Sequence, residues 1–261
     1  MRNYLILFLV VGVLLFVIFQ VNQRVETAIQ YFPPDDEALI DHAETNLDKQ
    51  DHTVTWEVMS SSSNFAYLRQ DVSLLYVNGQ FKGVLNKWKQ DQENMNMEQT
   101  FDIQHDALLQ SISFHYGELH NHSDDITSIQ KMTSDNLHLF PDEQKEATSL
   151  TLIDEQLQDH WQKLMKHYEM TPTDYEIIPL TDLIQYEETA LQGQTMEATQ
   201  KIVGQLWEGL YKNYIVPLST SKDEIPIHWM PVILIAKDNS HLIVLFEIEG
   251  KKHQLKQNIS S

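Results

Sequence analysis

Cysteine is absent from this chain of 261 residues. Disulfide bonds, thiolate metal sites, a lipid-modified N-terminal cysteine and a thiol nucleophile are therefore all excluded. Glycine is scarce, with eight residues, and neither a Walker loop nor a Gly-x-Gly-x-x-Gly motif occurs. Both motifs need glycines where the backbone approaches phosphate, so we expect no phosphate-binding loop and no nucleotide cofactor.

Basic residues are also scarce, with 18 Lys and Arg against 38 Asp and Glu, which gives a formal net charge of −20. Nucleic acid binding requires a basic surface that displaces counterions from phosphates, so this composition excludes it. An anionic membrane surface would likewise repel the body of the protein. A cationic partner, in contrast, would be attracted to it.

One long apolar run is present, from Tyr4 to Phe19, and no small-residue cleavage site follows it. Arg2 and Arg24 bracket 21 residues, which as a helix would span about 31 Å, close to the hydrocarbon core of a bilayer. The run predicts an uncleaved, single-pass signal anchor over residues 1–30. We expect the N-terminus inside and the C-terminal domain outside the cell membrane. An extracytoplasmic domain without cysteine is typical of bacteria that do not rely on oxidative folding.

Residues 31–52 are predicted to form an acidic stalk or linker. Pro33 and Pro34 interrupt any continuation of the membrane helix, and seven acidic residues then face only Lys49 as a basic neighbour. A cation-binding or partner-binding arm is the alternative interpretation, but charge runs are usually solvated. We therefore expect residues 53–261 to hold the whole core.

Residues 53–140 are predicted to be a β-rich subdomain, built as an antiparallel meander. Thr53–Val58 alternates with the period of a strand. Val72–Val77 and Phe81–Trp88 flank Asn78-Gly79, a strong hairpin signal because both central residues of a type I′ turn need positive φ. Further strands are expected at 100–103, 108–116, 126–132 and 136–140.

Residues 141–261 are predicted to be a helical subdomain closed by a C-terminal β-hairpin. Pro141-Asp142-Glu143 is a typical helix opening, and apolar residues follow at helical spacing up to Tyr168. A second helix is expected around residues 196–214, with Pro217 as its end. The apolar runs 231–236 and 242–248 predict central strands, and 252–259 predicts an edge strand. Strands, then helices, then strands indicate an α+β fold.

A cluster of histidines and carboxylates lies between His115 and Asp125. In a strand, residues two apart share a face. Glu118, His120, His122 and Asp124 would then project together, and imidazole and carboxylate are ligands for Zn²⁺, Ni²⁺ or Cu²⁺. The alternative is a polar hairpin tip with ordinary turn residues. The cluster is the one candidate metal site that the sequence offers.

No catalytic motif is convincing in its context. Ser128-Ile129-Gln130-Lys131 matches Ser-x-x-Lys and Ser134-Asp135-Asn136 follows, as in penicillin-binding proteins. Those motifs must come from separate elements, whereas here they are adjacent, and Ser128 lies in a predicted strand. We therefore predict no catalytic residues.

These observations favour a membrane-anchored, non-enzymatic accessory or interaction protein of the bacterial cell envelope, with a protein partner. Two alternatives remain open. One is a metal-dependent hydrolase or metal carrier that uses the His120/His122 cluster. The other is an extracytoplasmic ligand sensor with a pocket between the β-rich and helical halves.

Overall fold

The structure is a computed structural model that describes residues 32–35, 37–64, 66–103, 105–122, 125–220 and 228–259, with only the backbone at 121, 122, 125 and 220. The predicted anchor, Tyr4–Phe19, lies outside these residues. None of the described helices is both long enough and apolar enough to cross a membrane.

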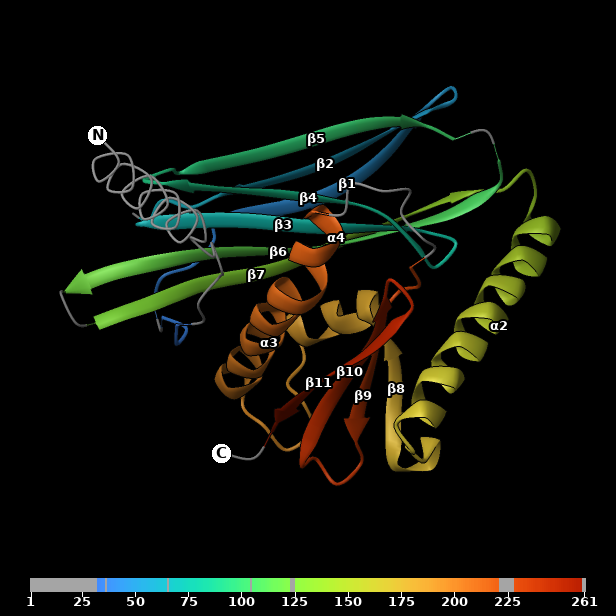
Figure 1. Cartoon of the computed structure of the whole chain (residues 1–261). Coiled ribbons are helices and arrows are strands. Elements are labelled where there is room, and N and C mark those ends of the chain that lie inside the picture. The colour runs from blue at the N-terminus through green and yellow to red at the C-terminus, as the bar shows by residue number, and fades with distance from the viewer. Residues whose placement is uncertain are drawn as a thin grey trace, which may run out of the picture.

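The described chain combines helices with three sheets of antiparallel strands (Figure 1). The strand orders are β1-β2-β5, β4-β3-β6-β7 and β11-β10-β9-β8. The mixed composition that the sequence predicts is therefore confirmed. The strands are β1 (His42–Gln50), β2 (Thr53–Ser61), β3 (Leu68–Val77), β4 (Gln80–Gln90), β5 (Asn94–Asp102), β6 (Ala107–His122), β7 (Asp125–Leu139), β8 (Tyr175–Pro179), β9 (Val232–Ala236), β10 (His241–Ile248) and β11 (Lys251–Asn258).

The β1-β2-β5 sheet packs on one face of the β4-β3-β6-β7 sheet. Strand β2 alternates buried and half-exposed residues along its whole length, as a strand with one buried face should. Its buried Val54 and Trp56 meet Leu75 of β3 and Leu109 of β6 in a small core between the two sheets. The N-terminal half is thus a β-sandwich.

The stalk prediction is wrong for residues 42–50, which form strand β1. Leu47 of this strand is buried in the sandwich core, and residues 33–35 pair with Ser128 on β7 through two main-chain hydrogen bonds. The acidic residues of β1 alternate with Thr45 and Leu47, which point inward. This period-2 pattern is hidden in the sequence because the residues near it are also polar. The expectation that residues 53–261 hold the whole core is therefore wrong.

The hairpin at Asn78-Gly79 is confirmed, with φ of 51° and 74°. The meander of short strands is corrected in one respect. The runs 126–132 and 136–140 belong to one long strand, β7, which pairs with β6 along nearly its whole length.

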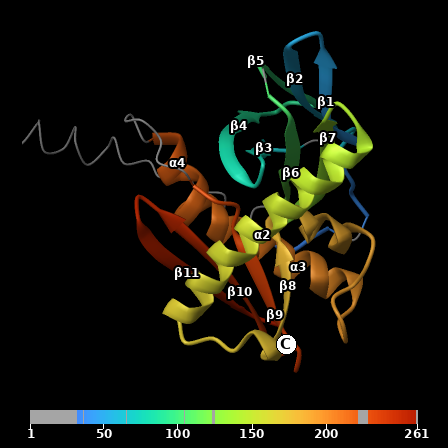
Figure 2. The ribbon, with the colours of Figure 1, turned by 90° about the vertical axis from the view of Figure 1, so that its right-hand side faces the viewer.

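The C-terminal sheet has helices on both sides. Helix α2 (Glu143–His167) lies on one side of it and α3 (Met196–Leu210) on the other (Figures 1 and 2). The predicted helix opening is confirmed, although Pro141 precedes the helix, and Asp142 caps α2 by accepting a hydrogen bond from the Lys145 N–H. Strands β9 and β10 are central, as their apolar sequences predict. Strand β8 and the 3₁₀ helix η2 (Leu180–Glu187) were not predicted, because each is short and Pro179 separates them.

Pro217 does not end the second helix, which corrects the sequence interpretation. A π-helical turn, Tyr211–Ile215, follows α3, and Pro217 then lies in the first turn of α4 (Val216–Thr220). Proline lacks an N–H and its ring crowds the preceding turn. The wider π turn accommodates both effects without interrupting the helical path.

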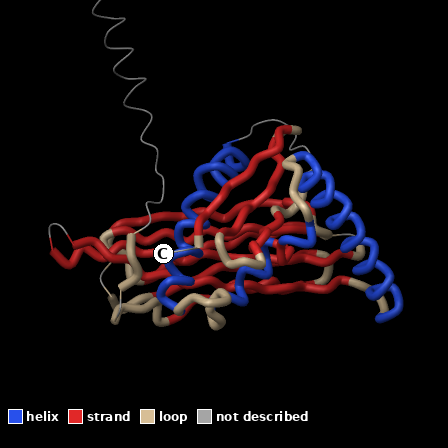
Figure 3. Tube along the Cα trace, turned by 90° about the horizontal axis from the view of Figure 1, so that it is seen from below, coloured by secondary structure: helices blue, strands red, loops and turns tan. Residues whose placement is uncertain are grey.

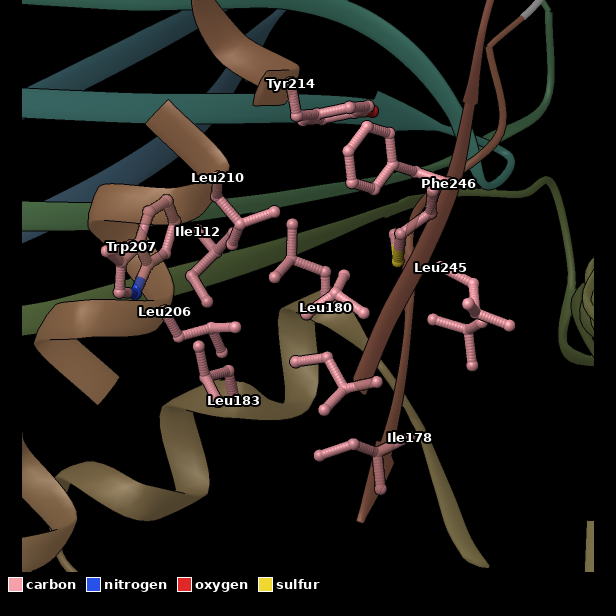
Figure 4. Packing of buried hydrophobic residues seen from close by; sticks show 14 of the residues in the cluster. Ile112, Ile178, Leu180, Leu183, Leu206, Trp207, Leu210, Tyr214, Leu245 and Phe246 are labelled. Carbon is pink, nitrogen blue, oxygen red and sulfur yellow. The ribbon is translucent and has the colours of Figure 1, made fainter. Parts of the chain in front are cut away.

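A single large core joins the two halves of the chain. Val72, Tyr76 and Phe114 of the β-sandwich belong to the same buried cluster as the helices and the C-terminal sheet. Figure 4 shows Tyr214 beside Phe246, and their ring centroids are 5.2 Å apart. Residue 140 thus marks a change in secondary structure, while the core continues across it.

Candidate functional site

The predicted metal cluster lies where β6 approaches its hairpin with β7, on the side of the molecule far from α2 (Figures 1 and 3). Glu118 and His120 share a face of β6, as their spacing predicts. The His120 Nε2 lies 3.4 Å from Glu118 Oε2, and the His120 ring stacks on Tyr67 with centroids 4.3 Å apart. Burial raises the pKa of Glu118, while its contact with His120 acts in the opposite direction.

The structure does not describe the side chains of the other two predicted ligands, and their place in the cluster stays a prediction. The β6–β7 register shifts between His120 and His122, and the side chains of His122 and Asp124 lie outside the described part. Within the described residues, no group of three or more His, Cys, Asp or Glu side chains is placed to hold a metal ion. The structure thus supplies two neighbouring ligands, Glu118 and His120.

A buried polar chain, which the sequence analysis did not identify, runs through the sandwich. His115 and Asp71 are fully buried, and their Nδ1 and Oδ1 atoms lie 3.2 Å apart, within ion-pair distance but not in hydrogen-bond alignment. His115 Nε2 lies 2.8 Å from Thr133 Oγ1, and Thr133 Oγ1 lies 2.6 Å from Thr45 Oγ1. The order of groups resembles a carboxylate–imidazole–hydroxyl relay.

The surroundings of this relay assign it a structural role. Ser60 donates to the second oxygen of Asp71 at 2.7 Å, and Arg69 donates to Ser60 at 2.5 Å. Beyond Thr45, the chain continues through Ser113, Ser73 and Ser111. A nucleophile needs an open approach for substrate and a site for the developing oxyanion. Here the hydroxyl of Thr133 instead joins strands β1 and β7. Sequence periodicity could have indicated this region, because Asp71, Ser73, Ser111, Ser113 and His115 all alternate with apolar residues.

Ser128 of the Ser-x-x-Lys match lies in a strand, as the sequence analysis expects. It lies within β7, is buried, and its hydroxyl donates to the Phe32 carbonyl at 2.8 Å.

The outer surface of the β1-β2-β5 sheet is acidic. Glu57 of β2 is directly opposite Glu98 of β5, and like charges in that position repel. Fifteen residues of these strands point outward, and they include five carboxylates and no Lys or Arg. We call this surface the acidic face; its carboxylates are Glu44, Asp48, Glu57, Glu98 and Asp102.

A groove of about 600 Å³ lies between α2 and β8. Trp161 and Met165 of α2 are its buried apolar residues, and Ile177 of β8 lines the other side. Polar side chains surround these residues. We call it the α2–β8 groove, lined by Gln158, Trp161, Gln162, Met165, Lys166, Glu169, Met170, Pro172 and Ile177.

A second cavity, of about 580 Å³, lies between the two halves of the chain. It is bounded by the β3–β4 turn, the segment that joins β5 to β6, and α2. Lys82, His105 and Asp106 contribute charged or titratable side chains, and Gln156 contributes an amide. This is the position at which a ligand sensor was expected to have its pocket.

No protein-family model matches the chain, and no curated protein matches it. A solved structure that does match is that of the sporulation control protein Spo0M from Bacillus subtilis, with 11% sequence identity and a TM-score of 0.19. The match covers 83% of this chain and 89% of that one. A likeness at this TM-score carries no conclusion about fold or function.

Proposed function

We propose that this is a membrane-anchored, extracytoplasmic accessory protein of the bacterial cell envelope that acts by binding a cationic protein partner. The acidic face is the observation that carries the proposal. Glu57 and Glu98 face each other across neighbouring strands. Their repulsion costs stability in the isolated protein, and a positive group placed between them would remove that cost.

The remaining features of the chain support binding over catalysis. The groups arranged most like a catalytic relay, Asp71, His115 and Thr133, are bonded into the interior of the sandwich. The net charge of −20 extends the attraction for cations beyond direct contact and would speed association with a basic partner. The apolar run Tyr4–Phe19 supports a position at the membrane.

A photo-crosslinking residue at Thr55, on the acidic face, tests the proposal in intact membranes. We expect one discrete adduct that weakens as salt rises, because salt screens exposed charges. The double variant Glu57→Gln/Glu98→Gln should weaken it too. The matched control carries the crosslinker at Lys163, an exposed residue of α2. A discrete adduct that forms equally from Lys163, or none from Thr55, would contradict the proposal.

The membrane position has its own test. Protease added to intact protoplasts should digest the domain, while the mature protein keeps its Met1 segment. A protected domain, or a mature N-terminus near residue 25, would exclude an uncleaved anchor with the body outside.

Metal binding is a second candidate function, favoured by the 3.4 Å contact of Glu118 with His120. Under this alternative, His122 and Asp124 would complete a site for Zn²⁺, Ni²⁺ or Cu²⁺ on a hydrolase or a metal carrier.

A further inference from the structure

We infer that the α2–β8 groove binds an extended, apolar and positively charged segment of a partner protein, which adds as a strand to the free edge of β8. The inference rests on the proposed function as an interaction protein and names a second contact surface, distinct from the acidic face.

The edge of β8 offers unpaired backbone groups at Ile177. The Leu180 N–H donates to the Pro231 carbonyl, and the Lys237 N–H donates to the Asp174 carbonyl. Leu180 and Asp174 are therefore hydrogen-bonded to the β9 side at the two ends of β8. Hydrogen-bonded pairs alternate along antiparallel strands. The N–H and C=O of Ile177 therefore point away from β9, and no partner for either occurs among the described residues.

The same edge is short, which limits what can bind there. Pro179 has no N–H, and the Tyr175 N–H is already donated to the Pro172 carbonyl. Prolines are a common protection of edge strands against unwanted pairing. One donor, at Ile177, remains available, so the edge can accept a brief stretch of peptide but cannot support an extended sheet.

The apolar part of the groove lies beside this edge. Trp161 is held in place because its Nε1 donates to the Met230 carbonyl at 3.0 Å. Met165 and Met170 add flexible side chains that adapt to different apolar groups. The amides of Gln158 and Gln162 complete a mostly apolar site with a few polar groups, which is the usual composition of a binding pocket. A strand that pairs with Ile177 would place alternate side chains against it.

The charge around the groove favours a cationic occupant. The opposite charges of Lys166 and Glu169, which both line the groove, offset each other. The groove lies at the C-terminal end of α2, a helix of 25 residues, and this end of a helix attracts positive charge. The chain as a whole carries a net charge of −20, so a second copy of it would be repelled.

Binding of a defined peptide tests the inference. The probe is a fluorescein-labelled nonapeptide of alternating Lys and Val. The full chain is held in nanodiscs of zwitterionic lipid, so that no free detergent competes for the groove. Fluorescence anisotropy measures the affinity. We expect saturable binding of this peptide and much weaker binding of the matched Glu and Val peptide.

Two pairs of variants locate the bound peptide. Ile177→Pro removes the outward N–H and leaves the β8–β9 hydrogen bonds intact. It should weaken peptide binding about tenfold, which is the effect of one or two hydrogen bonds. The control, Ile177→Val, keeps the N–H and should bind the peptide normally. Met170→Lys places a charge in the groove and should also weaken binding. Leu152→Lys, at a residue of α2 that is 53% exposed and does not line the groove, should leave it unchanged.

Several results would overturn the inference. They are the absence of peptide binding, equal binding to Ile177→Pro, and equal binding to Met170→Lys. If Ile177→Pro fails to fold, a peptide with N-methyl groups on alternate residues replaces it, and its undiminished binding to the unmodified chain would exclude strand addition. The crosslink from Thr55 is measured in the same Ile177→Pro protein. If the Thr55 crosslink persists in Ile177→Pro, the acidic face binds its partner independently of the groove. If the Thr55 crosslink is absent from the unmodified protein, that result contradicts the proposed function and not the peptide-binding groove.

Discussion

His115 and Thr133 meet inside the β-sandwich, where the imidazole Nε2 lies 2.8 Å from the threonine Oγ1. The contact links β6 to β7, and the Thr133 Oγ1 also lies 2.6 Å from the Thr45 Oγ1 of β1. A series of polar groups thus joins the two sheets, and Leu47, Trp56 and Leu109 belong to the apolar core between the same sheets.

The polar chain predicts a large stability effect at His115. His115→Ala leaves Asp71 buried without its imidazole partner and should lower the free energy of unfolding by about 3 kcal/mol. His120→Ala is the control, because that side chain is 37% exposed and should cost under about 0.5 kcal/mol. Urea unfolding followed by tryptophan fluorescence measures both. Equal costs would show that the buried relay contributes no particular stability.

Two constraints favour glycine at Gly79, a left-handed backbone and close packing against α2, and only the first applies at Gly250. Both glycines have φ of 74°, but a Cβ at Gly79 would lie 2.8 Å from Leu157 of α2, whereas nothing lies within 4 Å at Gly250. We expect Gly250→Ala to cost about 1 kcal/mol for the left-handed backbone. Gly79→Ala should cost about 3 kcal/mol, since overpacking against the helix is added. Thermal or urea unfolding of the two variants gives the difference, and a difference near zero would mean that α2 moves freely away from the hairpin.

Strand β1 predicts where the chain can be shortened. A chain that starts at Phe32 keeps β1 and the bonds of residues 33–35 to Ser128. It should be monodisperse and melt in one transition. A chain that starts at Thr53 loses Thr45 and Leu47 and uncovers one edge of β2, so we expect aggregation or a lower melting temperature. Calorimetry and size-exclusion chromatography compare the two. Equal behaviour would return residues 31–52 to the role of a stalk.

The carboxyl group of Glu187 leads us to predict that the stability of the protein depends on pH. Burial raises the pKa of Glu187 above the ordinary value of 4.5, although its Oε2 accepts the Met132 N–H at 2.9 Å. When the folded-state pKa exceeds the unfolded-state pKa, the contribution to stability is full below the unfolded-state pKa and is lost as pH rises through the folded-state pKa. Glu187→Gln keeps an oxygen for Met132 and should therefore stabilise the protein at pH 7.

The gain from Glu187→Gln should shrink as the pH falls towards 4.5, where the carboxyl group becomes neutral without the substitution. Urea midpoints across this range provide the measurement. Glu188→Gln, the same change at an exposed neighbour, is the control. A gain that is constant with pH, or equal in both variants, would contradict the prediction.

Titration calorimetry with Zn²⁺, Ni²⁺ and Cu²⁺ separates the two candidate functions. On the preferred function we expect no saturable heat, because two neighbouring ligands do not make a site. Saturable binding at one equivalent that disappears in His120→Ala/His122→Ala would instead establish the metal alternative. Such a site would also raise stability, by about 2.7 kcal/mol at a hundredfold excess over Kd.

The sequence was sufficient where the signal is local. The Asn78-Gly79 turn, the start of α2 near Asp142 and the apolar strands β9 and β10 each depend on residues close in the chain, through turn geometry, the helix dipole and burial on both faces. The shared face of Glu118 and His120 follows in the same way from the period of a strand.

Only the tertiary structure decided the features that join distant residues. Strand β1 reads as a polar linker until β2 pairs with it and Leu47 enters the core. Asp71, His115 and Thr133 lie on three strands, and the acidic face and the α2–β8 groove each combine separate segments. Turns, helix starts and apolar strands follow from neighbours along the chain. A buried relay, a charged face or a groove depends instead on which elements pack together, and that is set by long-range burial of apolar surface.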